Sequence, residues 1–184
     1  MRRLVPSDYR SMPWRNGGGT TTELVVDEGA RSRFLYRVSI ADVAGDGPFS
    51  RFEGYDRHIM LLEGAGMTLD CGTRGPIELR PFEPRAFSGD WQVQGRLTRG
   101  AVRDFNVMVD RARATSTLDV RVITAPEEIA CDPGNTCVVY VIEGSLASAS
   151  KGETLVAQRP IELVPHAPAR VAIARIALLA PGAP

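Results

Sequence analysis

The sequence predicts an all-β fold, either a β-sandwich or a β-barrel, and three observations lead to this prediction. Short apolar or alternating runs recur along the 184 residues with almost no helical periodicity. The 18 glycines and 13 prolines punctuate these runs, as tight turns between strands require. An apolar run that ends in Glu-Gly occurs twice, at Glu63-Gly64 and at Glu143-Gly144. This internal repeat predicts two related halves, residues 1–112 and residues 113–184.

Eleven strands are expected, each for a local reason. The first is a β-branched run that follows three glycines, and the second and seventh alternate between polar and apolar residues. The third and ninth are the apolar runs that end in Glu-Gly, and the others are short runs between glycine- or proline-rich turns. In chain order the expected strands are 20–26, 34–43, 58–63, 67–70, 77–79, 92–97, 102–109, 118–123, 137–143, 154–157 and 171–179.

Charge and composition exclude several classes of protein. The chain carries 22 Lys and Arg against 22 Asp and Glu, so its formal net charge is zero. Without a basic excess, neither nucleic acid nor an anionic membrane surface is an expected partner. A net charge of zero favours self-association, which leaves a homodimer open. The hydrophobic fraction of 43% is typical of a folded globular protein.

Cysteine use and the N-terminal segment predict a cytoplasmic protein. Cys71, Cys131 and Cys137 form no Cys-x-x-Cys motif, and their odd number argues against a disulfide framework. The first residues are charged and no apolar core of a signal peptide follows them. No apolar run approaches the length that a membrane-spanning helix needs.

The segment 12–24 predicts a ligand-facing bend. Consecutive Gly17, Gly18 and Gly19 have a large entropic cost on folding, and they are useful where φ is positive or the backbone approaches something closely. Arg15 and Asn16 precede them, so their N–H groups and the Arg15 guanidinium suit a small anionic or polar ligand. A phosphate-binding loop is excluded because no Gly-Lys-Ser/Thr follows. A mobile hinge remains the alternative.

The run Pro-Trp-Arg-Asn-Gly-Gly-Gly at 13–19, with Thr and Glu downstream, resembles the signature of the HutD/Ves family of small cupin-like proteins. Further blocks at 37–41, 47–57, 89–90 and 104–108 resemble that family in the same order. The resemblance covers about residues 10–113, and Glu53 departs from it where a proline is common. It implies a cupin-like fold of two halves with a pocket in the first, and a role in histidine utilisation or stress response without an assigned reaction.

The resemblance to cupins also places the positions of a typical metal site. If Gly64 marks the central hairpin, Arg57 occupies the position of the glutamate ligand, and the two histidine positions fall near Ser50 and Phe52. Arginine cannot be deprotonated in proteins and does not ligate metals. Its guanidinium instead suits a carboxylate, so Arg57 is a candidate for holding a carboxylate ligand, with a rim arginine in a surface ion pair as the alternative.

The second half offers no better metal site. Cys137 stands at the equivalent glutamate position, and the chain has only two histidines, His58 and His166, far apart in sequence. We therefore expect no metal ion and no other cofactor. Cys137 as a nucleophile has no neighbouring histidine, and a buried structural thiol is the preferred interpretation.

Alternation along two expected strands places polar residues on shared faces. Arg37, Ser39 and Ala41 lie on one face of 34–43, and Asp104, Asn106 and Met108 lie on one face of 102–109. An apolar core side and a solvated side is the ordinary explanation. The family resemblance instead makes the polar faces candidate walls of the pocket.

We therefore expect a metal-free, cupin-like protein that binds a small carboxylate metabolite. The alternative is a metal-independent enzyme that uses Asp104 or Glu23 as a base, and a third interpretation is a structural partner protein. Trp14 either stacks on a planar ligand or packs in the core. The candidate ligand-binding residues are Trp14, Arg15, Asn16, Gly17, Gly18, Glu23, Arg37, Ser39, Ser50, Arg57, Asp104 and Asn106.

Overall fold

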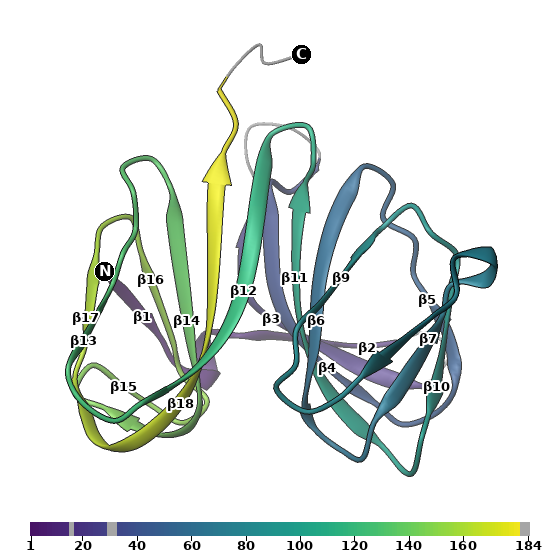
Figure 1. Ribbon diagram of the computed structural model, residues 1–184, viewed down its shortest axis with the longest axis horizontal. Helices are drawn as coiled ribbons and strands as arrows, with labels where there is room; N and C mark the ends of the chain where they lie inside the picture. The colour runs from purple at the N-terminus through teal and green to yellow at the C-terminus, as the bar shows by residue number, and fades with distance from the viewer. Residues whose placement is uncertain (15–16, 29–32, 181–184) are drawn as a thin grey trace. The chain divides into compact units, whose positions relative to one another are not determined.

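The computed structural model describes residues 1–14, 17–28 and 33–180, and this part of the chain is built of strands with two short 3-10 helices (Figure 1). The all-β prediction is confirmed. The fold divides into two compact units: Arg10–Ala112, and Met1–Tyr9 together with Arg113–Pro184. The sequence analysis placed residues 1–9 in the first half. In the structure β1 (Arg2–Leu4) pairs with β16 (Thr154–Ala157), so these residues belong to the other unit.

The Arg10–Ala112 unit consists of two antiparallel sheets. A six-stranded sheet has the order β2-β3-β4-β11-β6-β9, and a four-stranded sheet has the order β5-β10-β7-β8. A 3-10 helix, Gly72–Arg74, connects β7 to β8. The strands are β2 (Arg10–Pro13), β3 (Gly19–Asp27), β4 (Tyr36–Val43), β5 (Gly47–Phe49), β6 (Tyr55–Glu63), β7 (Met67–Asp70), β8 (Pro76–Leu79), β9 (Arg85–Ser88), β10 (Val93–Leu97) and β11 (Val102–Asp110).

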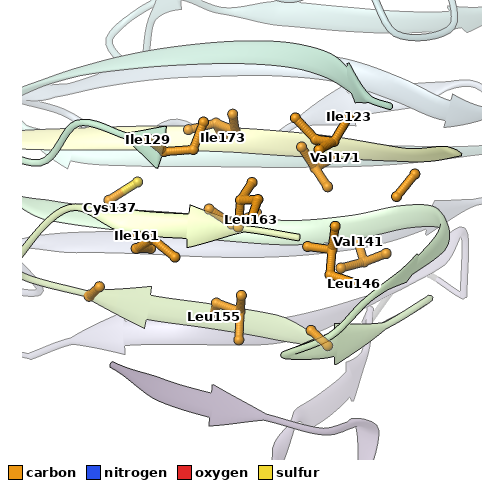
Figure 2. Packing of buried hydrophobic residues seen from close by; sticks show 14 of the residues in the cluster. Ile123, Ile129, Cys137, Val141, Leu146, Leu155, Ile161, Leu163, Val171 and Ile173 are labelled. Atoms are coloured by element: carbon orange, nitrogen blue, oxygen red, sulfur yellow. The ribbon is translucent and has the colours of Figure 1, made fainter. Parts of the chain in front are cut away.

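The other unit has a six-stranded sheet, in which β15 pairs with β14 beside the path β1-β16-β14-β18-β12, and a two-stranded sheet of β13 and β17. Its 3-10 helix is Pro6–Asp8. The side chains in Figure 2 belong to its core, to which the large sheet and the β13–β17 pair both contribute. The remaining strands are β12 (Ala114–Ile123), β13 (Glu127–Ile129), β14 (Thr136–Leu146), β15 (Ala149–Ser150), β17 (Ile161–Leu163) and β18 (Pro165–Leu178).

All eleven predicted strands are present, and several begin earlier or end later than predicted. The largest difference is at β18, which begins at Pro165, whereas the sequence predicts a strand only from residue 171. The structure also contains strands that the sequence analysis missed, and these are short segments of two to four residues. Such segments are too short to show a period of two, and their pairing partners alone make them strands.

The core of the Arg10–Ala112 unit lies between its two sheets. Ile59 and Leu61 of β6 belong to the same buried cluster as Met67 and Leu69 of β7. Because side chains alternate along a strand, Arg57 points to the same face of β6 as Ile59 and Leu61. The charged residue therefore lies on the face of the sheet that the core covers.

The strand register brings the predicted polar faces together. β11 lies between β4 and β6, where Asn106 is paired with Ser39 on one side and Ile59 on the other. In the next row Met108 is paired with Arg37 and with Arg57. Residues paired across antiparallel strands share a face, so one continuous polar patch forms across three strands.

A bulge and a glycine turn shape the edge of this sheet. The β3–β4 register shifts between Glu23 and Val25, which keeps Glu23 opposite Ser39. Gly17 has φ +71°, a conformation that glycine adopts without strain. Gly19 is required for another reason, because a Cβ there would lie 2.3 Å from the backbone oxygen of Asp42.

Candidate functional site

A cavity of about 570 Å³ opens at the polar patch of the Arg10–Ala112 unit. It is lined by three groups of residues: the polar patch itself, the β2 edge, and the segment that contains and follows β5. Its lining residues are Met12, Pro13, Trp14, Thr21, Arg37, Ser39, Ala41, Pro48, Phe49, Ser50, Phe52, Arg57, Asp104, Asn106 and Met108.

Arg57 is the buried cation of this cavity. Its exposed fraction is only 5%, and desolvation lowers its pKa from 12.5 to about 10, so the guanidinium remains charged at neutral pH. The Nε and Nη2 atoms donate to Oδ1 of Asn106 over 3.3 and 3.2 Å, and Nη1 donates to the backbone oxygen of Ser50 over 3.3 Å. Among the described residues no carboxylate forms an ion pair with Arg57.

These bonds leave part of the guanidinium free. Arginine has five N–H donors, and the three bonds of Arg57 use one on Nε, one on Nη1 and one on Nη2. One N–H on each terminal nitrogen therefore remains without a partner among the described side chains and backbone atoms. Two such donors on neighbouring nitrogens match the two oxygens of a carboxylate.

Aromatic rings surround the Arg57 guanidinium. Its carbon lies 4.7 Å from the ring centroid of Phe87, 5.5 Å from that of Phe49 and 5.7 Å from that of Phe52. Ring faces attract a cation and exclude water, which partly compensates for its burial. The rings also limit where the guanidinium can move, so its free N–H groups keep a defined direction.

Asn106 links Arg57 to the buried carboxyl group of Asp104. Its Nδ2 donates to Oδ1 of Asp104 over 3.3 Å, while its Oδ1 accepts from Arg57. Asp104 is 2% exposed, and burial raises its pKa from 3.8 to about 7, although the hydrogen bond from Asn106 and the charge of Arg57 both oppose this rise. Asp104 therefore changes its charge close to neutral pH.

Arg37 is the second cation of the cavity and has its own carboxylate partner. Its Nη1 lies 3.5 Å from Oε1 of Glu23, and its Nη2 lies 3.3 Å from Sδ of Met108. Its guanidinium carbon is 4.9 Å from the centroid of the Phe52 ring, so Phe52 lies beside both cations. Burial lowers the pKa of Arg37, and its buried Nε has no hydrogen-bond partner among the described residues.

The structure brings together seven of the twelve predicted site residues in this cavity. They are Trp14, Arg37, Ser39, Ser50, Arg57, Asp104 and Asn106.

The other predicted residues lie elsewhere or outside the described part of the chain. Glu23 is paired with Arg37 but does not line the cavity, and neither do Gly17 and Gly18 in the β2–β3 turn. Arg15 and Asn16 lie outside the described residues, so the prediction that Arg15 supplies a second cation stays a prediction.

Trp14 serves the core and the cavity together. Its ring packs against the buried cluster between the two sheets, and it also lines the cavity. Its Nε1 donates to Oγ1 of Thr21 over 2.8 Å, which holds the ring in place. Both interpretations of Trp14 from the sequence therefore remain compatible with its position.

The sequence analysis missed the apolar walls. Phe49 and Phe52 lie in the 47–57 block that was quoted for its resemblance, yet only its polar residues were selected. Met108 shares a face with Asp104 and Asn106 by the same alternation, and this pattern would have been sufficient to include it among the candidate residues. Phe87 on β9 has no local signal, because only its pairing with Arg57 brings its ring to the guanidinium.

The cavity does not have the donors of a typical cupin metal site. The described side chains that line the cavity supply one carboxyl group, one amide, three hydroxyl groups and no imidazole. The described residues contain no group of three or more His, Cys, Asp or Glu side chains that is arranged to hold a metal ion. Arg57 lines this cavity, and its positive charge repels a metal ion.

Cys137 is unsuited to nucleophilic chemistry. Its side chain has no exposed surface and belongs to the core cluster shown in Figure 2. Burial raises the pKa of its thiol to about 11, so the thiolate is scarce at neutral pH. The interpretation of Cys137 as a buried structural thiol agrees with this environment.

Comparison with known proteins identifies the family. A family model described as HutD matches residues 6–178. The chain belongs to the HutD family. A curated relative, an uncharacterised 21.2 kDa protein from the hutC 3′ region of Pseudomonas putida, is 45% identical over 109 residues, which are 59% of this chain. The match spans 57% of that relative's length.

Two solved structures of similar proteins cover nearly the whole chain. A conserved protein of unknown function from Pseudomonas aeruginosa PAO1 is 32% identical with a TM-score of 0.86, and the match covers 96% of this chain and 98% of that one. HutD from Pseudomonas fluorescens SBW25, in a formate condition, is 29% identical with a TM-score of 0.84, and the match covers 97% and 99% of the two chains.

More distant neighbours show the fold alone. A cupin 2 conserved barrel domain protein from Leptotrichia buccalis is 10% identical with a TM-score of 0.55, and the match covers 92% of this chain and 96% of that one. This HutD-family chain is therefore cupin-like in fold. None of the helices in its described residues is long and apolar enough to cross a membrane.

Proposed function

We propose that this HutD-family chain binds a small carboxylate metabolite in the cavity beside Arg57, without a metal ion. The observation that carries the proposal is a buried, charged arginine whose partners are an amide and a backbone carbonyl rather than a carboxylate. A buried charge that no carboxylate contacts directly is costly, and a ligand carboxylate relieves this cost. Its two oxygens match the N–H groups that Arg57 leaves free.

The rest of the cavity suits a small organic anion. Phe49, Phe52 and Met108 supply apolar walls, whereas Ser39 and Asn106 supply polar groups beside the cation. A mostly apolar cavity with a few convergent polar groups is the common form of a small-molecule site. The volume of about 570 Å³ fits a metabolite and not a polymer.

Calorimetric titration tests this proposal directly. Wild-type protein is titrated with formate, glutamate, formylglutamate and urocanate, and the formate condition of the Pseudomonas fluorescens HutD structure makes formate the first choice. Arg57→Ala should abolish binding, and Arg57→Lys should restore only part of it because an ammonium group lacks the planar fork of two N–H groups. Affinity should also weaken as salt is added.

A matched control distinguishes the loss of Arg57 from the loss of an arginine charge anywhere on the protein. Arg96 on β10 is exposed and paired with Asp70, so Arg96→Ala removes the same side chain outside the cavity and should leave binding unchanged. Circular dichroism should show that each variant is folded. Equal affinity of the wild type and Arg57→Ala for every carboxylate bound would place the site elsewhere and overturn the proposal.

A regulatory role in histidine or amino-acid utilisation, or in the response to stress, is the physiological setting that we infer. The name of the Pseudomonas putida relative places it in the hutC 3′ region, which supports a link with histidine utilisation. A binder predicts thermal stabilisation by a metabolite without turnover.

We also infer that the two units are related cupin halves. β6 pairs with the last strand of its unit and ends at Glu63, before Gly64. β14 likewise pairs with the last strand of its own unit and contains Glu143 and Gly144. Both glycines have positive φ, +107° and +76°, which supports a common hairpin design.

An enzyme is the second candidate, and one observation favours it. Asp104 is buried beside the proposed anion site with a pKa of about 7, which is the value a general base needs at neutral pH. An enzyme predicts that a bound carboxylate is consumed, which nuclear magnetic resonance of the incubated metabolite detects. Loss of this turnover in Asp104→Asn with retained binding would favour the enzyme, and absence of turnover in the wild type would exclude it for that metabolite.

A further inference from the structure

Among the described residues, four charged side chains lie in or beside the cavity. Arg37 and Glu23 are paired with each other, so their charges offset one another. The remaining two groups are Arg57 and Asp104, which the amide of Asn106 connects. When Asp104 is ionised, the four groups have no net charge. When Asp104 is protonated, they carry one positive charge.

The free energy of binding a carboxylate differs between these two states of Asp104. Beside an ionised Asp104 it places a second negative charge next to the single guanidinium of Arg57, and both of these side chains are buried, which strengthens the repulsion between the carboxylates. Beside a protonated Asp104 it neutralises Arg57, and the set again has no net charge. Two carboxylates that share one site cannot both be ionised without a large cost.

We propose that the cavity takes up a carboxylate together with one proton, and that Asp104 is the group that receives the proton. This inference rests on the proposed function, since it concerns the same site. Asp104 is a positioning residue here, because it sets the charge that the ligand meets. In the empty cavity its carboxylate balances the charge of Arg57 through Asn106. It becomes neutral when the carboxylate of the ligand balances that charge instead. The amide of Asn106 keeps its hydrogen bonds in both states.

The groups that face Asp104 support this assignment. Arg57 on β6 favours its ionised form, and Asp42 on β4 favours its neutral form. Arg37 and Glu23 act on the site as a pair. Of the described residues in the four-stranded sheet, only the uncharged Pro48 and Phe49 line the cavity. Asp104 is thus the one carboxyl group among the described lining residues, and burial sets its pKa to about 7.

The sign of the pH dependence follows from linkage. Below pH 7 Asp104 already holds its proton, so ligand binding takes up few protons from solution and the affinity for the carboxylate is highest. Above pH 7 each binding event must draw a proton from solution, and the dissociation constant should rise about tenfold per pH unit. The rise should stop once the pH exceeds the pKa of Asp104 in the ligand complex, which the bound anion raises further.

Direct measurement of proton uptake tests the inference. Formate is the probe, because its single carboxyl group does not titrate near neutral pH. Unbuffered protein held near pH 8 is mixed with saturating formate at the same pH, and a pH-stat records the acid that the sample consumes. We expect close to one proton per chain near pH 8 and almost none near pH 5.5. Sodium chloride at equal concentration corrects for ionic strength.

Two variants identify the group that takes up the proton. Asp104→Asn keeps the size of the side chain and the acceptor for Asn106, so it should bind formate without proton uptake and with little pH dependence. Glu63→Gln is the control: Glu63 is an exposed carboxylate on the strand of Arg57, with its Oε1 3.7 Å from Nη1 of Arg103, and its loss should leave uptake unchanged.

Each outcome has a distinct meaning. Formate binding measured by calorimetry without proton uptake overturns the coupling and leaves the proposed function intact. Uptake that persists in Asp104→Asn assigns the proton to another group and overturns the role of Asp104. Absence of binding heat with formate, glutamate, formylglutamate and urocanate alike overturns the proposed function, and this inference with it.

Discussion

Replacing Asp104 with Asn should remove a pH-dependent loss of stability. Burial raises the pKa of Asp104 from 3.8 to about 7, so the folded protein holds a proton that the unfolded chain has already lost. This stabilisation is complete below the unfolded pKa and disappears as the pH rises through the folded one. Each pH unit corresponds to about 1.4 kcal/mol, so the interval from pH 5 to pH 7 removes about 3 kcal/mol from the wild type.

Urea denaturation at several pH values between 5 and 8 measures this effect. The free energy of unfolding of the wild type, minus that of Asp104→Asn, should fall by about 3 kcal/mol across this range, because all other groups titrate alike in both proteins. Below pH 3.8 the two should have similar stability, since Asp104 is then protonated in both states and an amide resembles the protonated acid. Glu63→Gln should parallel the wild type. A constant difference between wild type and Asp104→Asn would refute the reasoning, because Asp104 would then not titrate differently on folding.

The glycine turn gives one further prediction, and the lack of a metal-binding group among the described side chains gives another. Gly19→Ala should lower the melting temperature more than Gly17→Ala, because its Cβ meets the backbone oxygen of Asp42, whereas Gly17 at φ +71° costs only about 1 kcal/mol. Equal melting of both variants and the wild type would mean that the turn is only a hinge. Purified protein should contain no stoichiometric transition metal by elemental analysis, and one equivalent that survives dialysis would contradict this.

Much of the fold follows from local pattern. The alternation at 34–43 and 102–109 was sufficient to predict β4 and β11, because side chains on a strand have a period of two whatever the strand pairs with. The apolar runs before Glu-Gly likewise predicted β6 and β14. Short strands such as β5 and β9 escaped prediction, since three or four residues carry too little pattern and hydrogen bonds to a distant strand define them.

The family motif and the cupin comparison also singled out Arg57, which the structure places in the cavity. Its position before the Glu63-Gly64 turn follows from counting along one strand, and its poor fit to a metal site follows from its chemistry. That it is buried does not follow, because the covering rings of Phe49, Phe52 and Phe87 come from three different segments.

The sequence by itself determined which residue types can hold an anion and which faces of two strands they occupy. Only the tertiary structure decided their partners. Glu23 and Asp104 were equivalent candidates for a general base, and the register of β3, β4 and β11 pairs Glu23 with Arg37 and connects Asp104 to Arg57 through Asn106. The reason is physical: side-chain direction is a local property of the backbone, whereas register, burial and pKa depend on strands that are distant in sequence.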